Sequence, residues 1–291
     1  MARLLQQVIN GISVGSLYGL IAIGLTLIYR VLGFTQLAHG EMAMLGGYVG
    51  IWVLSLTSDN IGIAVVAVVV LMFTLGVVLE RFLFRRFETA NHLIPLLVSL
   101  ALALALQEAA RNLINHGLPL PYPLALQSAT NISVWQLTIN GVQIIEIVAT
   151  VLLVGLLNLL LYRTGFGLQI RAVADNRDIA RILAINPNRV GMIVFAVATA
   201  IAAIAGVLYG VAYNAISPEL GALLSFKALA AALLGGLGRI SGAIIGGLTL
   251  GLVETLGSGY ISSAFSDAIA FGVIILVLRI RPGGILSSVT R

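Results

Sequence analysis

The sequence predicts an all-α polytopic membrane protein, because the chain is too apolar to cover a soluble domain and its apolar residues lie in long uncharged stretches. Of its 291 residues, 59% are hydrophobic and 9% are charged, whereas soluble domains carry about 25% charged residues. A helix of about 20 apolar residues crosses the roughly 30 Å hydrocarbon core of a bilayer. Stretches of about this length are 8–29, 61–79 and 191–213, which have no charged side chain, and 143–161, in which Glu146 is the one charged residue.

Hydropathy predicts nine membrane helices in one transmembrane domain that spans 1–291, and the positive-inside rule orients them. Placing Arg81, Arg85 and Arg86 in the cytoplasm puts 13 of the 16 basic residues inside, the N-terminus outside and the C-terminus inside. Eight or ten spans remain open, because the Gly-rich stretch 233–247 could be a helix, a hinge or a re-entrant loop. The nine expected helices lie near 8–29, 34–56, 61–79, 93–112, 143–161, 191–213, 223–237, 242–257 and 265–280.

The loop 113–142 is expected outside the membrane and contains no Asp, Glu, Lys or Arg. Its end alternates apolar and polar residues around Asn140-Gly141, a pair typical of a type I′ turn. We therefore expect a small external β-hairpin centred on these two residues.

Several function classes are excluded by what the sequence lacks. The basic residues lie between apolar segments and form no stripe with aromatics, which disfavours nucleic-acid binding. The chain has no cysteine, and its histidines show no metal-ligand spacing, so we expect no metal site and no catalytic residue. Gly11-Ile-Ser-Val-Gly15 matches a nucleophile motif but lies in a membrane helix. No phosphate-binding loop of the ATPase type is present, so we expect that this chain does not hydrolyse ATP itself and holds no cofactor.

Ionisable residues within apolar segments are costly in a membrane and are therefore candidates for function. His39, Glu41 and Glu254 are expected to shape a translocation pathway, to latch its states or to pair internally, and simple packing is an equally good interpretation. Glu108 is expected to pair with Arg111 one turn later. Three acidic residues at the ends of predicted helices are expected at the membrane interface, namely Glu80, Glu146 and Asp267.

Glycines recur at spacings that let helices approach closely. Gly46 and Gly47 follow the segment with His39 and Glu41 and are added to the candidate pathway or gating residues. The Gly-rich stretch is the candidate hinge, through Gly235, Gly236, Gly238 and Gly242.

The expected cytoplasmic loop 163–190 can form two short helices. The second is predicted to start near Asp175 or Asn176, with one of them as N-cap, and to stop at Asn186-Pro187. It would present an apolar face made of Ile179, Ala180, Leu183 and Ala184. From the residues alone, this helix could be a solvated connector or a knob that docks into a groove of a partner.

Three segments resemble the branched-chain amino acid ABC permease family. The loop Gly167-Leu-Gln-Ile-Arg-Ala-Val-Ala-Asp-Asn176 is similar to the coupling loop of that family. Phe34-Thr-Gln-Leu-Ala-His-Gly-Glu41, followed by Met44-Leu-Gly-Gly-Tyr48, and the Gly-rich stretch with Glu254 resemble its other two motifs in order and spacing. The length and the N-terminal pattern resemble the smaller permease subunit. The chain departs from the family at Thr35-Gln36-Leu37, at Arg239 where Ser is common, and at Ala184 where Gly is common.

The resemblance implies a type II ABC importer fold in a bacterial inner membrane. A homologous second permease, two cytoplasmic ATPases and a periplasmic substrate-binding protein would be the partners, with the lipid bilayer around the permeases. The coupling loop would contact the ATPases through Arg171, Ala172, Asp175, Asn176, Ile179, Ala180 and Leu183.

The resemblance implies import of branched-chain or other neutral amino acids by alternating access. Two alternatives stay open. The same family type could import urea or short amides. A chain of another class could act alone as an ion-coupled transporter, with a relay through Glu41 or Glu254.

Overall fold

The computed structural model is a bundle of helices and describes residues 1–57, 60–87, 93–122, 132–134 and 137–286. Seven described helices, two of them counted with an adjoining 3₁₀ turn, are long and apolar enough to cross a membrane. They are α1 (Ala2–Leu32), α3 (Ile61–Phe82), α4 (Leu93–Leu113), α5 (Gly141–Arg163), α8 (Pro187–Tyr213), α10 (Ile240–Tyr260) and α11 (Ser266–Ile280).

Four further helices complete the described bundle. They are α2 (His39–Leu56), α6 (Gly165–Asp175), α7 (Arg177–Ile182) and α9 (Leu220–Gly235). Each of the nine segments predicted from hydropathy coincides with a helix, but α2 and the shorter α9 are not among the seven that meet the length and composition of a membrane span. The structure thus confirms a polytopic helical protein, and the number of nine spans stays a prediction.

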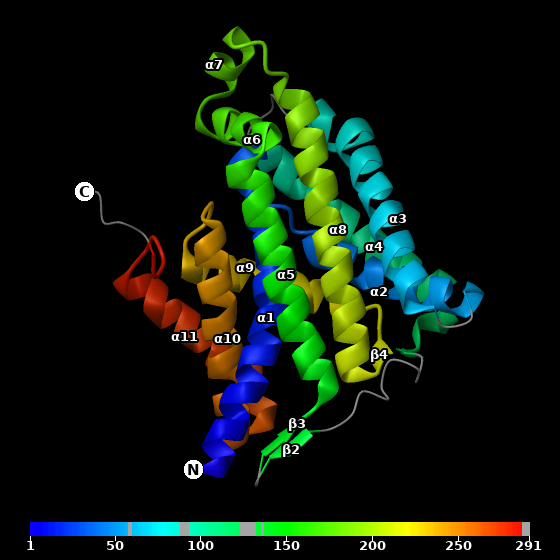
Figure 1. Ribbon diagram of the computed structural model, residues 1–291, viewed down its shortest axis with the longest axis vertical. Helices are drawn as coiled ribbons and strands as arrows, with labels where there is room; N and C mark the ends of the chain where they lie inside the picture. The colour runs from blue at the N-terminus through cyan, green and yellow to red at the C-terminus, as the bar shows by residue number, and fades with distance from the viewer. Residues whose placement is uncertain (58–59, 88–92, 123–131, 135–136, 287–291) are drawn as a thin grey trace.

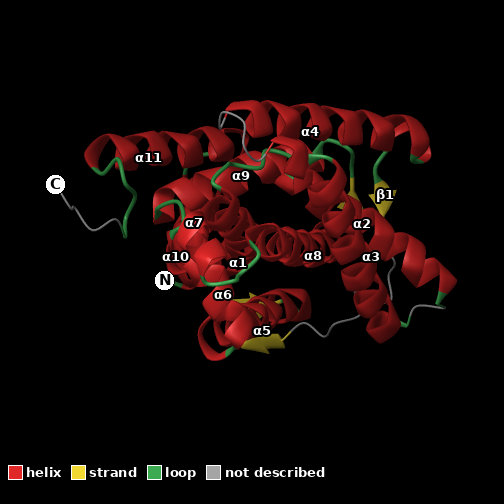
Figure 2. Cartoon of the chain, turned by 90° about the horizontal axis from the view of Figure 1, so that it is seen from above, coloured by secondary structure: helices red, strands yellow, loops and turns green. Residues whose placement is uncertain are grey.

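The core of the bundle is formed by α1 and α8, which are mostly buried. Seen from above, α4 and α11 lie along one side and α5 lies on the opposite side (Figure 2). The α3, α4, α5 and α11 helices bury only a minor part of their residues, and their exposed side chains are largely Val, Leu and Ile. An apolar outer layer around a packed core is the arrangement that a lipid environment requires.

Small residues set the distance between the central helices. Gly15 of α1 lies directly against the backbone of Gly247 and Gly251 on the antiparallel α10, so that a side chain at either α10 position would meet α1 backbone. On the other side of the core, Gly46 of α2 packs against Ala203 of α8. Tight packing through small residues is the usual basis of helix association in membranes.

Two short antiparallel pairs of strands lie at the same end of the molecule as the N-terminus (Figure 1). The pairs are β1 (Leu120–Pro121) with β4 (Ala215–Ile216), and β2 (Ile132–Val134) with β3 (Leu137–Ile139). The second pair is tied to α1, because Gln6 exchanges hydrogen bonds of 2.9 and 3.0 Å with the backbone of Thr138. We call this end of the bundle the hairpin end.

The predicted position of the hairpin turn is wrong. Asn140 and Gly141 start a helix: the Asn140 side chain accepts from the backbone N–H of Val142 at 3.1 Å and forms a capping box with Gln143. In the β2–β3 pair, Val134 instead lies opposite Leu137 and Ile132 lies opposite Ile139. An Asn-Gly pair suits either a tight turn or a helix start, and here the capping residue Gln143 three positions on decides for the helix.

Candidate functional site

The α6 and α7 helices project from the end of the bundle opposite the hairpin end (Figure 1). Thr164 caps α6 by accepting from the backbone N–H of Gly167 at 3.0 Å. Asn176 caps α7 by accepting from the N–H groups of Asp178 and Ile179 at 2.9 and 3.0 Å. The predicted start of the second loop helix at Asn176 is therefore confirmed, and the caps explain why two such short helices form.

Arg171 fixes α6 to the end of α5. Its guanidinium donates to the carbonyl of Leu161 and lies 5.3 Å from the centre of the Tyr162 ring. Ala172 is half-buried, whereas Asp175 and Asn176 are exposed. Arg171 thus anchors the loop to the bundle and the other polar residues face outward.

The predicted apolar face of α7 is split by the structure. Ala180 is buried at 1% exposure, whereas Ile179 and Leu183 are 55% and 64% exposed. Ile182, which was not predicted on this face, is 83% exposed. The helix therefore packs on the bundle through the small Ala180 and presents three large apolar side chains outward, which marks an interaction surface.

Ala184 follows α7 in the left-handed conformation, with φ of 59°. The N–H of Ile185 bonds to the carbonyl of Ala180, and the N–H of Ala184 bonds to that of Arg181, both at 3.0 Å. These two bonds form a Schellman motif, in which glycine is the favoured residue at the left-handed position. The structure explains in physical terms why this position favours Gly, and Ala184 carries the strain that Gly would avoid.

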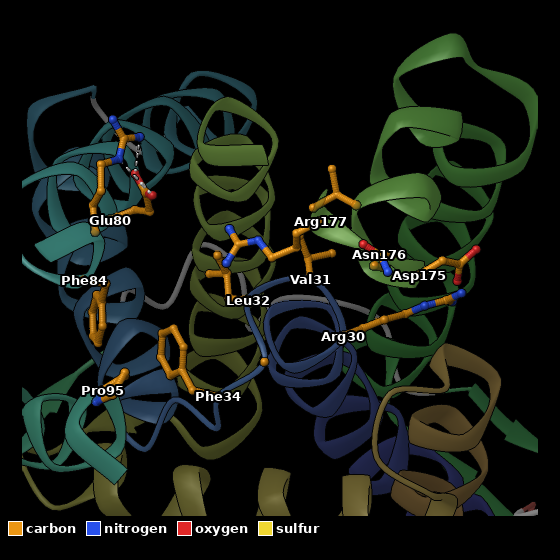
Figure 3. A pocket seen from close by; sticks show the side chains of 14 residues that line it. Arg30, Val31, Leu32, Phe34, Glu80, Phe84, Pro95, Asp175, Asn176 and Arg177 are labelled. Carbon is orange, nitrogen blue, oxygen red and sulfur yellow. Dashed lines mark hydrogen bonds and ion pairs between the residues drawn. The ribbon is translucent and has the colours of Figure 1, made fainter. Parts of the chain in front are cut away.

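A pocket of about 330 Å³ separates α6 and α7 from the ends of α1 and α3 (Figure 3). On one wall, Glu80 of α3 is 1% exposed and accepts from Arg85 at 2.8 Å. Arg85 also donates to the carbonyl of Asn188 on α8 at 3.3 Å. Glu80 thus lies near the end of α3, as predicted, and is buried in an ion pair that links α3 to the start of α8; its position at the membrane interface stays a prediction.

Arg177, the first residue of α7, lines the same pocket. Burial lowers the pKa of its guanidinium below the ordinary value, and the charge of Arg181 lowers it further, while Glu80 and Asp178 oppose the shift. The start of α7 and the Glu80–Arg85 pair therefore lie within electrostatic reach of each other.

His39 and Glu41 lie in the first turn of α2 and are 0% and 1% exposed. His39 packs against Gly24 of α1, and its Nδ1 lies 3.3 Å from Gln36 Oε1. Glu41 packs against Gly221 of α9, and its Oε2 has no hydrogen-bond partner among the described residues.

The adjoining backbone joins α2 to α9, because the N–H of Gly40 donates to Ser225 Oγ at 2.8 Å. Gly46 and Gly47 lie further along α2, where Gly47 contacts Ile216 and Gly206. The structure thus brings His39 and Glu41 to one polar junction of α1, α2 and α9, while the two glycines serve the packing of α2.

Glu254 belongs to a different cluster, centred on Lys227 of α9. The Lys227 ammonium is 2.7 Å from Glu254 Oε1, 3.0 Å from Asp267 Oδ1 and 2.8 Å from the Tyr18 hydroxyl. Lys227 is 5% exposed. Of the roles considered for Glu254, the structure supports internal pairing, and the pairing joins α1, α9, α10 and α11.

The candidate hinge is a sharp connection between α9 and α10. Gly236 and Gly238 have φ of 99° and 87°, which an L side chain rarely adopts. Gly235 and Gly242, on either side of them, contact each other so closely that neither leaves room for a Cβ atom. The stretch is therefore a tight turn between two helices.

The sequence analysis also makes predictions for three other acidic residues. Glu108 pairs with Arg111 at 3.5 Å as predicted, and Arg111 also reaches Glu219 at 3.3 Å. Glu146, expected at the interface, is 2% exposed inside the bundle. Asp267 is 54% exposed in its ion pair with Lys227.

Lys227 is one of the ionisable residues in apolar segments, but the sequence analysis assigns it no role. Its charge within an uncharged helix was a signal, but its partners are distant in sequence: Tyr18 lies 209 residues away and Glu254 lies 27 residues away.

Comparison with known proteins identifies the family. Residues 7–278 match the model of the branched-chain amino acid transport system permease component. The chain is 36% identical to the high-affinity branched-chain amino acid transport system permease protein BraD of Pseudomonas aeruginosa, over 97% of this chain and 95% of the relative. It is 35% identical to LivH of Escherichia coli K12 over the same shares, and 28% identical to a probable LivH of Methanocaldococcus jannaschii over 91% and 87%. No solved structure matches. The chain belongs to the permease family of the branched-chain amino acid ABC transport systems.

Proposed function

We propose that this chain is the translocation subunit of an ATP-driven importer for branched-chain or other neutral amino acids. The match to the branched-chain permease family over residues 7–278 carries this proposal. The relatives named for branched-chain amino acids match nearly the whole chain, which favours amino acids over urea or short amides.

The proposed assembly places this permease beside a homologous second permease in a bacterial inner membrane. Two ATPase subunits engage α6 and α7 from the cytoplasm and bind ATP and magnesium, and a periplasmic protein delivers substrate to the hairpin end. The nine helices predicted from hydropathy cross the membrane, with the N-terminus outside and the C-terminus inside. The single domain 1–291 supplies the pathway and no cofactor site.

The exposed side chains of Ile179, Ile182 and Leu183 suit contact with the ATPases, because an apolar patch on a capped helix is a common way to dock into a groove. A push on α7 would pass to α8 directly and to α3 through the Glu80–Arg85–Asn188 link. The pocket behind α7 leaves room for such a displacement. Alternating access follows if the bundle has two arrangements that the ATPases bias.

The assembly is tested by isolating the chain from its native membrane under mild detergent. We expect a second permease and two ATPases to co-purify in a stable complex. If the chain purifies without partners and transports solute in a process that is driven by an ion gradient and needs no ATPases, the proposal is overturned. In that case Glu41, rather than the paired Glu254, would be the first candidate for an ion relay.

A further inference from the structure

A second pocket, of about 430 Å³, lies between α1, α5, α8 and α10 toward the hairpin end. The hairpin end is the end of the bundle opposite α6 and α7 (Figure 1). One part of its lining is apolar, formed by Val14, Leu17, Val142 and Ala212. The rest consists of amide, hydroxyl and phenol groups with one carboxylate, that of Glu146.

Glu146 has an unsatisfied carboxylate oxygen. Its Oε2 accepts from the Ser13 hydroxyl, whereas its Oε1 has no hydrogen-bond partner among the described residues. The side chain is 2% exposed, and none of the ion pairs between described residues includes it. A buried carboxylate without a partner is costly, so its presence beside a pocket points to a ligand that supplies the missing donor.

Polar neighbours of Glu146 are already engaged with one another. Asn10 Oδ1 accepts from Gln6 Nε2 at 3.1 Å and from Gln143 Nε2 at 2.9 Å. Gln143 Oε1 accepts from the backbone N–H of Asn140 at 3.3 Å, and Thr255 Oγ1 of α10 donates to the carbonyl of Gln7 on α1 at 3.2 Å. These bonds hold the α1, α5 and α10 walls in place and leave Glu146 Oε1 as an open acceptor in a fixed frame.

We propose that this pocket binds a neutral amino acid, with the α-ammonium group of the ligand on Glu146 and its aliphatic side chain against Val14, Leu17 and Val142. An ammonium–carboxylate contact is a charge-assisted hydrogen bond and discriminates strongly against analogues that lack the amine. The volume falls within the range of small-molecule pockets, and the mixed lining suits a ligand with one charged and one apolar end. The inference rests on the proposed function and gives it a substrate site.

Binding to the permease–ATPase complex without the periplasmic protein tests the site, because any bound amino acid is then on the membrane subunits. Isothermal titration would compare leucine with 3-methylbutylamine, which keeps the ammonium, and 4-methylpentanoate, which lacks it. We expect the first two to bind the wild-type complex and the third to bind at least tenfold more weakly. Equal binding of 4-methylpentanoate and leucine would overturn the proposal without any variant.

Variants separate the carboxylate from the pocket. We expect Glu146→Gln to weaken leucine binding at least tenfold, and Glu146→Asp to recover part of it because the charge is restored. The matched control is Glu108→Gln, which removes a carboxylate that is 60% exposed and lies outside this pocket; its affinity should equal that of wild type. Unchanged leucine affinity in a monodisperse Glu146→Gln complex would overturn the proposal.

The two proposals fail in different ways. Absence of ATP-dependent uptake by the complete wild-type transporter would contradict the proposed function. If the wild-type transporter shows ATP-dependent uptake but Glu146→Gln leaves the leucine affinity of the permease–ATPase complex unchanged, only the proposed amino acid site is contradicted.

Discussion

At the scale of single residues, two positions show how local chemistry limits what this bundle can tolerate. Ala184 occupies a left-handed position that closes α7, and Lys227 is a buried cation that depends on three partners from three other helices. The first position stores backbone strain, and the second holds a charge that cannot lose its partners without cost. Each leads to a substitution with a defined direction.

Replacing Ala184 by glycine should stabilise the end of α7. The left-handed conformation costs an L residue roughly 1–2 kcal/mol, part of which glycine loses again through its greater freedom in the unfolded chain. We expect a gain of about 0.5–1 kcal/mol, seen as slower amide hydrogen exchange over residues 177–185. Ala184→Val is the matched opposite and should speed exchange there. Equal exchange in all three proteins would contradict the assigned strain.

Replacing Lys227 by methionine should destabilise the bundle, because Glu254 would be left buried without its cation. Breaking one side of a buried ion pair costs about 3–5 kcal/mol. We expect a lower thermal midpoint for Lys227→Met and a partial recovery when Glu254→Gln is added, since the double variant leaves only the 54% exposed Asp267 without its cation. Strictly additive effects of the two substitutions would show that the pair is not coupled.

At the scale of elements, hydropathy was sufficient to place the nine apolar helices, because uncharged stretches of this length have few other stable conformations in a membrane. A helix cap was predictable where a single capping residue determines the helix start, as at Asn176. It was not predictable at Asn140-Gly141, because this pair suits both a tight turn and a helix start. The face of α7 could not be predicted, because its burial is set by the neighbouring α6 and α8 rather than by its own periodicity: only the small Ala180 is buried.

The exposed α7 residues provide the element-scale test of coupling. Ile179→Glu should leave the permease folded, because Ile179 is 55% exposed, and should remove most ATP-dependent uptake by placing a charge in the proposed contact with the ATPases. Ile179→Leu is the control and should transport normally. Ala180→Glu is a poorer probe, since Ala180 is buried. Normal uptake by the Ile179→Glu transporter would contradict the coupling role of α7.

The α1–α10 contact gives a second test at this scale. Gly251→Val places a branched side chain against the backbone of Gly15 and Gly11. Because backbone cannot move aside as a flexible side chain can, we expect a large loss of folded protein, measured as the monodisperse fraction in size-exclusion chromatography. Gly155→Val on α5, where nothing lies within 4 Å of a new Cβ atom, is the matched control and should express normally. Equal yields would contradict the close approach.

At the scale of the whole molecule, the polar clusters could not be assembled from the sequence. His39 and Glu41 were selected as candidate pathway residues of one segment, and both are buried. Glu254 was grouped with them, but the structure pairs it with Lys227 on the other side of α9. Glu80 and Glu146 were placed at the interface because they lie near the ends of predicted helices. Both are buried: Glu80 pairs with Arg85 five residues further on, and Glu146 accepts from Ser13 of α1. The second contact joins two helices that are far apart in the sequence, and a single sequence does not show such a pairing.

The central claim is ATP-driven import of neutral amino acids, and uptake by the complete transporter tests it most directly. Proteoliposomes that contain both permeases, the ATPases and the binding protein would be supplied with labelled leucine, alanine or urea, with ATP or without it on the ATPase side. We predict ATP-dependent accumulation of leucine, none without ATP, and no accumulation of urea. Accumulation of urea in place of leucine, or leucine uptake that follows an ion gradient without ATP, would contradict the account.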